Sequence, residues 1–513
     1  MVKEPSFPSI GEIARLRLHI QETWNDLTRS LVHAVEAARD PKLEATGARY
    51  PLYISNTEKA ERVSRKLQKV LPPEAYELLS IRPLPNDSQK ITEHGLLYLP
   101  GRYVVPGGRF NEIYGWDSYF IVIGLLRVGR VGLARSMADQ LLYQVNHYGT
   151  VLTANRTYYL TRSHPPLLGR MVLAVYEATG DLDWLEKALP LLEKLYFYWV
   201  VPPHGLPSLP LSRYHDFGQG PAPEVETGER DESGRNHYER LADWFRTNQV
   251  QGYDDYFDAA TGKLKEAAYR GDRAMRESGF DPAWRFGPGN IDIGSYAPVC
   301  LNSLLWRLET DIALVREILD ATATMQVWVD RANQRAEILR DLLWDESDGL
   351  FFDYNQNRNS RVRYPFATTF WPLWAGVATP DQARRVAGNL SLFESNGGLL
   401  ASTQMTGCQW DAPFTWAPLA YMAVAGLTRY GYIPDARRLA RKFIALVNSE
   451  FKRTGLIFEK YDGIHCTSDV SDRISFGYPT NEPGFGWTNA CTIELLAFLG
   501  SLGHAAYARV QSF

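Results

Sequence analysis

The chain has 513 residues, of which 45% are hydrophobic, 12% aromatic and 22% charged. This composition is that of a folded globular protein and excludes disordered and fibrous classes. The 55 basic and 59 acidic residues give a net charge of −4 without a basic tract, so we expect no nucleic-acid partner.

The beginning of the chain shows no export pattern. Residues 1–20 lack the apolar core of a signal peptide, and no uncharged apolar run approaches the ~18 residues of a membrane span. The cysteines Cys300, Cys408, Cys466 and Cys491 lie far apart and form no CxxC pair, which argues against a zinc site and a disulfide framework. We therefore expect a cytoplasmic protein with no membrane association and no metal.

Residues 1–90 are charged and helix-prone and contain no catalytic pattern. We predict an N-terminal helical extension there and a catalytic domain over residues 91–513.

A helical period dominates beyond residue 120. Within residues 131–149, Leu133, Met137, Leu141 and Val145 fall on one stripe. Further helices are predicted over residues 167–180, 182–200 (with a kink or break at Pro190), 300–321, 325–345 and 434–451. Strand-like runs are short and no βαβ alternation occurs, so the fold class is all-α, built from helical hairpins. The long loops between the helices are expected to carry the chemistry.

Two early loops are rich in polar and aromatic side chains. Residues 106–120 combine Arg109, Trp116 and Asp117 after a Pro-Gly-Gly turn, which allows close approach of the backbone to a ligand. Residues 155–166 add Arg162, an amide from Asn155 and several tyrosines. A structural turn with a surface ion pair is the alternative for the first loop.

A third loop offers a candidate general acid. Asp281 lies between Phe280 and Pro282, and an apolar setting raises the pKa of a carboxyl group, as acid catalysis near neutral pH requires. Pairing with Arg285 would oppose this effect, and a helix N-cap is the alternative role for Asp281.

Later loops supply rings and a second carboxylate. Trp410 and Trp416 flank Asp411 in residues 409–418, where they could form a stacking wall. Glu459 ends a β-rich apolar run, and residues 481–489 could form a mobile lid. Two carboxylates on separate loops suggest glycoside hydrolysis, in which an inverting enzyme holds acid and base ~6.5–9.5 Å apart.

Two long segments, PGGRFNEIYGWDSY and QWDAPFTWAP, resemble the two signature segments of the trehalase family of glycoside hydrolases. RSHPP, ESGFD, EKYD and GFGWTN occur in the same order, so that the resemblance covers about residues 95–495. It implies an (α/α)6 toroid and inverting hydrolysis of an α-glucoside without a cofactor.

The resemblance also implies roles for individual residues. The general acid falls on Asp281 and the general base on Glu459. Sugar-contacting positions fall on Arg109, Phe110, Trp116, Asp117, Asn155, Arg162, Glu224 and Gly279, and we expect His164, Trp410 and Trp416 to line the same pocket.

The chain departs from the family pattern at three places. His164 stands where the family has Gln, Ala222 where it has Arg, and Gly477-Tyr478 where a glycine-rich run ends in Glu-Tyr. These positions lie on the sugar-binding side, so the reaction is better supported than the substrate.

The best single substrate is α,α-trehalose, cleaved to two glucose molecules. The first alternative is glucosylglycerate or mannosylglycerate, because YVVPGGRF, GPAPE and NRTYYLTR are also similar to the hydrolases of those compounds. The second alternative is a sugar-binding protein without catalytic activity on the same toroid.

Overall fold

The computed structural model describes residues 4–43, 47–231 and 233–500. Within these residues, six helices form an inner ring in which each contacts the next and the last contacts the first. They are α5 (Asp117–Arg127), α7 (Leu168–Thr179), α12 (Val299–Ile318), α14 (Trp371–Ala375), α16 (Ala417–Arg429) and α18 (Gly486–Gly500).

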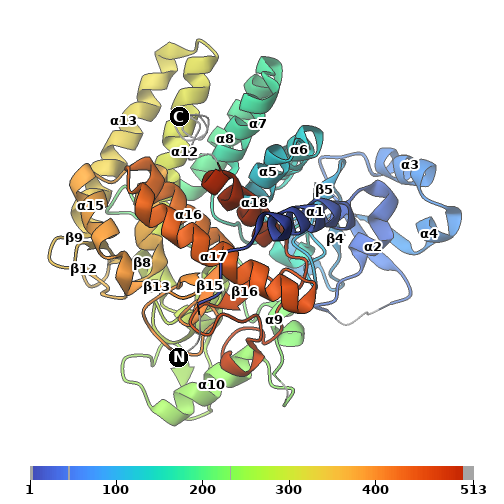
Figure 1. Ribbon diagram of the computed structural model, residues 1–513. Helices are drawn as coiled ribbons and strands as arrows, with labels where there is room; N and C mark the ends of the chain where they lie inside the picture. The colour runs from blue at the N-terminus through green and yellow to red at the C-terminus, as the bar shows by residue number, and fades with distance from the viewer. Residues whose placement is uncertain (1–3, 44–46, 232, 501–513) are drawn as a thin grey trace.

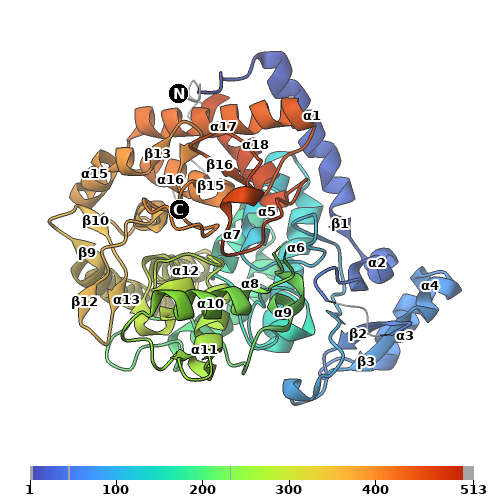
Figure 2. The ribbon, with the colours of Figure 1, turned by 90° about the horizontal axis from the view of Figure 1, so that it is seen from below.

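An outer layer of helices surrounds this ring (Figure 2). In the described part of the chain, it consists of α1 (Ile10–Asp26), α6 (Val131–Tyr148), α8 (Leu182–Val200), α13 (Thr322–Ile338), α15 (Pro380–Gly388) and α17 (Ile433–Thr454). The fold is therefore the (α/α)6 toroid.

The two layers differ in how much of each helix is buried. Residues 417–427 of α16 are buried on all sides, whereas α6 buries the stripe that contains Leu133, Met137, Leu141 and Val145. Gly180, with φ of 66°, ends α7 in the left-handed conformation. Pro190 does not end α8, because the helix continues to Val200 while packed against α7 and α12.

The N-terminal region divides into two parts. Helix α1 packs against α17 and α18 in the outer layer. A separate lobe, at the right of Figure 1, contains the parallel sheet β3-β2-β4, formed by β2 (Tyr50–Ile54), β3 (Leu79–Pro83) and β4 (Leu96–Leu97), with α3 (Ala60–Val70) and α4 (Pro73–Glu77) beside it. This sheet was not among the elements expected from the sequence. Strand β2 is buried at four consecutive positions and so lacks the alternation that marks a strand.

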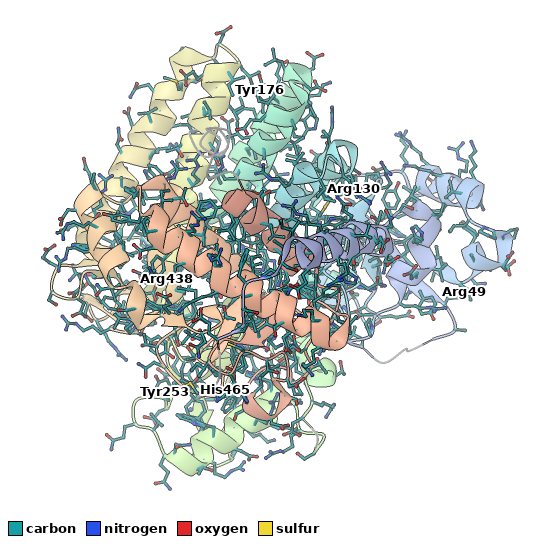
Figure 3. The ribbon with its side chains drawn as sticks, viewed as in Figure 1. Arg49, Arg130, Tyr176, Tyr253, Arg438 and His465 are labelled. Carbon is teal, nitrogen blue, oxygen red and sulfur yellow. The ribbon has the colours of Figure 1, made fainter. Side chains whose placement is uncertain are left out.

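The loops that precede the inner helices gather at one end of the toroid. Figure 3 shows Tyr176, near the end of α7, at one end, and Tyr253 and His465, from two loops, at the other. The loop end also holds α9 (Pro223–Gly228), α10 (His237–Asn248), α11 (Glu266–Glu277) and the pair β15 (Phe414–Trp416) and β16 (Lys460–Asp462) (Figures 1 and 2). None of the described helices has the length and apolar character needed to cross a lipid bilayer.

Candidate active site

A cavity at the loop end is bordered by the first turns of the inner helices α5 and α18. Its wall comes from segments spread over most of the chain. It is lined by Lys42, Pro106, Arg109, Phe110, Tyr114, Trp116, Asp117, Thr153, Tyr159, Arg162, His164, Glu224, Glu229, Arg276, Gly279, Asp281, Trp410, Glu459, Tyr478, Phe485 and Trp487.

Asp281 enters this cavity from the loop after α11. Gly279 makes the approach possible, since its φ is +75° and a β-carbon there would lie 2.9 Å from the Trp116 ring. Burial raises the pKa of Asp281 to about 7, although the Arg276 guanidinium, 3.5 Å from its Oδ2, opposes the shift. Only 28% of the side chain is exposed, so Asp281 keeps a proton close to neutral pH.

Asp281 takes neither of the alternative roles considered from the sequence. The next α-helix, α12, begins at Val299 with Pro298 as its N-cap, so Asp281 does not cap a helix. Arg285 pairs with Asp353 instead, with Nε 2.5 Å from Oδ2. The cation beside the acid is therefore Arg276, which also forms ion pairs with Glu229 and Asp272.

Glu459 enters the cavity directly before β16 and is 2% exposed. Its Oε1 accepts a hydrogen bond from the Tyr478 hydroxyl, and its Oε2 accepts one from Lys460 Nζ at 3.2 Å. Its main-chain N–H donates to the Glu482 carbonyl at 2.9 Å, which fixes the backbone. Burial raises the pKa of Glu459, while the Lys460 ammonium and the Tyr478 hydroxyl favour the carboxylate.

Asp117 is a third carboxyl group in the cavity and interacts electrostatically with both Asp281 and Glu459. It lies in the first turn of α5 and lines the cavity. Burial raises its pKa well above the ordinary value, and the charges of Glu459 and Asp281 act in the same direction. Asp117, Asp281 and Glu459 therefore share one enclosed space.

Arginines occupy the side of the cavity next to α9. Arg162 pairs with Glu224, and its Nη1 lies 3.4 Å from Oδ2 of Asp216. Arg109 lies 5.2 Å from the Tyr478 ring centroid, and its main-chain N–H donates to Glu482. Such fixed donors suit the hydroxyl groups of a sugar.

The remaining wall is aromatic. Trp410 stacks on Trp416 with ring centroids 3.9 Å apart and planes at 5°. Trp116 contacts Trp410 at 5.9 Å and Trp487 at 5.6 Å between centroids. The rings form a rigid apolar surface of the kind that packs against sugar rings.

Known proteins share this arrangement of sequence and fold. A family model described as Trehalase matches residues 11–500. The chain belongs to the trehalase family. It is therefore a glycoside hydrolase, as expected from the sequence.

Fungal proteins are among the relatives of this trehalase-family chain. The cytosolic neutral trehalase of Saccharomyces cerevisiae is 32% identical over 550 aligned positions, which cover 94% of this chain and 71% of the yeast protein. The cytosolic neutral trehalase of Neurospora crassa is 34% identical, with coverage of 92% and 71%.

Solved structures show the same toroid. Neutral trehalase Nth1 from Saccharomyces cerevisiae matches with a TM-score of 0.79 and 31% identity, over 97% of this chain and 96% of that chain. A GH63 mannosylglycerate hydrolase from Thermus thermophilus matches with a TM-score of 0.51 and 17% identity, over 77% and 96% of the two chains, which shows the fold alone.

The structure brings most of the residues expected at the trehalase-family site into one lining. They are Arg109, Phe110, Trp116, Asp117, Arg162, His164, Glu224, Gly279, Asp281, Trp410 and Glu459. His164 Nδ1 accepts a hydrogen bond from the main-chain N–H of Trp116 at 3.3 Å. Burial lowers the pKa of His164 to about 3, so its ring is neutral near neutral pH.

Asn155 and Trp416 lie outside this lining. Asn155 is fully buried, accepts from the Ile113 N–H at 2.9 Å and donates to the Leu97 carbonyl at 3.0 Å. Trp416 lies behind Trp410 and is fully buried. Both residues hold wall segments in place.

Several lining residues were not among those expected from the sequence. Arg276 starts the segment that contains Asp281, and Tyr478 stands at one of the departures from the family pattern, so both had a local signal. Lys42 had none, since only tertiary structure brings its ammonium to Glu112, 2.9 Å away, beside the cavity. Within residues 4–43, 47–231 and 233–500, no cluster of His, Cys, Asp and Glu has the arrangement of a metal site.

Proposed function

We propose that this protein hydrolyses α,α-trehalose to two glucose molecules with inversion at the attacked carbon. The observation that carries this proposal is the shared cavity, whose lining holds both Asp281 and Glu459 together with arginines and aromatic rings. The relatives named cytosolic neutral trehalase support both the substrate and a location in the cytosol.

The two carboxyl groups have complementary tasks in this mechanism. Asp281 donates its proton to the interglycosidic oxygen, so that the leaving glucose departs as a neutral alcohol. Glu459 accepts a proton from a water molecule that attacks the anomeric carbon from the opposite face. Burial of Asp281 favours the first step, and Lys460 and Tyr478 favour the ionised form of Glu459 for the second, against the burial that raises its pKa.

The stereochemistry of the first turnover tests the mechanism. Inversion of one α-linkage releases one β-glucose and one α-glucose, which proton NMR resolves before mutarotation. Asp281→Asn and Glu459→Gln should each lower kcat by about 1,000-fold or more while the fold is retained. Near-normal activity of either variant, or the release of α-glucose alone, would contradict the assignment.

One observation supports a second candidate substrate, a glycerate glycoside. Lys42, Arg162 and Arg276 are paired with carboxylates, whereas Arg109 forms no ion pair with any residue in the described ranges. A glycerate carboxylate could bind that guanidinium. Assays of the purified protein on trehalose, glucosylglycerate and mannosylglycerate at equal concentration separate the two proposals, because the better substrate has the higher kcat/KM.

A further inference from the structure

The acid-bearing loop and the base are joined by a buried chain of hydrogen bonds. Gln409 Nε2 donates to the main-chain carbonyl of Asp281, and Gln409 Oε1 accepts from Lys460 Nζ at 3.2 Å. Lys460 Nζ also donates to Glu459 Oε2 at 3.2 Å. The chain therefore runs from the backbone of the proposed acid to the carboxylate of the proposed base.

All three hydrogen-bond donors of the Lys460 ammonium are used. An ammonium has three N–H donors, and those of Lys460 serve Glu459, Gln409 and the Thr480 carbonyl, the last at 3.0 Å. Gln409 is 1% exposed and Lys460 0%. A buried cation with fixed partners resists displacement, since any movement would leave a charge unpaired.

The surrounding structure holds this chain in place. Trp416 Nε1 donates to the Gln409 carbonyl at 2.9 Å, and Trp416 is the register partner of Lys460 in the β15–β16 pair. The main-chain N–H of Trp410 donates to the main-chain carbonyl of Pro282 at 3.1 Å, next to Asp281. Trp410, which lines the cavity, and Trp416, which lies behind it, therefore fix both ends of the connection.

Gly477 leaves the space that the Gln409 amide needs. Its φ is +110°, and a β-carbon there would lie 2.7 Å from the Gln409 Cδ. The departure from the family pattern at Gly477-Tyr478 thus places Tyr478 on Glu459 and leaves Gln409 undisturbed.

We propose that Gln409 and Lys460 form a positioning bridge that sets the separation of acid and base and keeps the base ionised. This inference rests on the proposed function, since it takes Asp281 as acid and Glu459 as base. Neither bridge residue is among the described side chains that line the cavity, so both act through the carboxyl groups and not on the sugar.

Two variants test the bridge. Gln409→Met removes both hydrogen bonds with little change in volume, and should lower kcat by about 30-fold with KM changed less than about three-fold. Lys460→Met removes the cation, so the pKa of Glu459 should rise and the acidic limb of the kcat/KM pH profile should move up by about one pH unit. The alkaline limb, which reports Asp281, should not move.

The matched control is Gln140→Met. Gln140 is a buried glutamine on α6 that bridges the Gly101 N–H and the Ser136 carbonyl, away from the cavity. The Gln140→Met variant should lose about as much stability as the two bridge variants and keep the kcat and pH profile of the wild type. If both bridge variants behave like this control at equal folded concentration, the bridge has no positioning role.

The outcomes also separate this inference from the proposed function. If Asp281→Asn and Glu459→Gln remain active, the acid and base assignment fails. If those two variants are inactive but Gln409→Met and Lys460→Met keep wild-type kcat and pH limbs, only the bridge fails. If Lys460→Met does not fold, the kcat of Gln409→Met decides.

Discussion

The hydroxyl group of Tyr478 donates a hydrogen bond to Oε1 of Glu459. The Tyr478 ring also lies 3.9 Å from Lys460 Nζ and 5.8 Å, between centroids, from the Phe110 ring. One residue from the segment before α18 therefore contacts both the proposed base and the sugar-binding wall.

Tyr478→Phe should keep the ring and lose this hydrogen bond. Because the hydroxyl favours the carboxylate form of Glu459, its loss should raise the pKa of Glu459 and lower kcat by about ten-fold below pH 6. The loss should shrink at higher pH. A pH series of initial rates measures it, and the control is Tyr253→Phe, since the Tyr253 ring packs against Phe245 and is not among the described residues that line the cavity. An equal loss at every pH would exclude an effect on the ionisation of the base.

Asp281→Asn should stabilise the protein at alkaline pH. The folded-state pKa of about 7 exceeds the ordinary 3.8, so the folded state holds this proton more tightly than the unfolded state. The contribution of Asp281 to the free energy of unfolding is thus largest below pH ~4 and falls as pH rises towards 7. Asn cannot ionise, so the variant should exceed the wild type by about 2 kcal/mol at pH 8 and match it at pH 4.

Thermal unfolding at the two pH values measures this difference. Asp469→Asn is the control, because the side chain of Asp469 is 74% exposed and should give no gain at pH 8. A gain for Asp281→Asn that is equal at pH 4 and pH 8 would show that ionisation is not its cause.

Lys42 lies outside the motifs that resemble the trehalase family, yet Lys42→Met should weaken substrate binding. Lys42 Nζ lies 2.9 Å from both carboxylate oxygens of Glu112, which Arg156 also contacts at 2.7 Å. Glu112 belongs to the loop that carries Arg109 and Phe110, so loss of this anchor should raise KM by about ten-fold and lower kcat less. Lys66→Met, an exposed lysine of the N-terminal lobe, should change neither value. Unchanged KM in Lys42→Met would show that this contact does not support the wall.

Trp24→Ala should destabilise the whole toroid. Trp24 is fully buried on α1, which contacts α17 and α18. The cavity created should cost about 3–5 kcal/mol of unfolding free energy, measured from denaturant midpoints. Leu18→Ala on the same helix is the control, since Leu18 is 56% exposed and should change the midpoint little. If the two variants unfold at the same midpoint, α1 does not contribute to the core.

Local patterns predicted much of the helical framework. The stripe of Leu133 and Met137 has the period of α6, and Gly180 ends α7 where a left-handed residue is needed. The sheet β3-β2-β4 was missed, because a five-residue strand buried at nearly every position has no periodic signature.

The site was predictable where its residues lie within continuous motifs. Arg109 and Asp117 share one segment, and both reach the cavity. Lys42 could not be found this way, since its nearest partner, Glu112, is remote in sequence and their contact depends on tertiary structure. The roles of Asn155 and Trp416 in holding the wall likewise depend on which side of a loop faces inward, which a motif does not record.

Closure of the helical ring has a consequence for synthesis on the ribosome. Helix α18 closes the inner ring by contacting α5 and also packs against α1, yet it emerges long after both of them. Until then the apolar faces of α1 and α5 lack their final neighbour, and such exposed surfaces promote aggregation of a nascent chain. The native fold should therefore be completed only after α18 has left the ribosome. Chaperones should stay bound to the nascent chain until then.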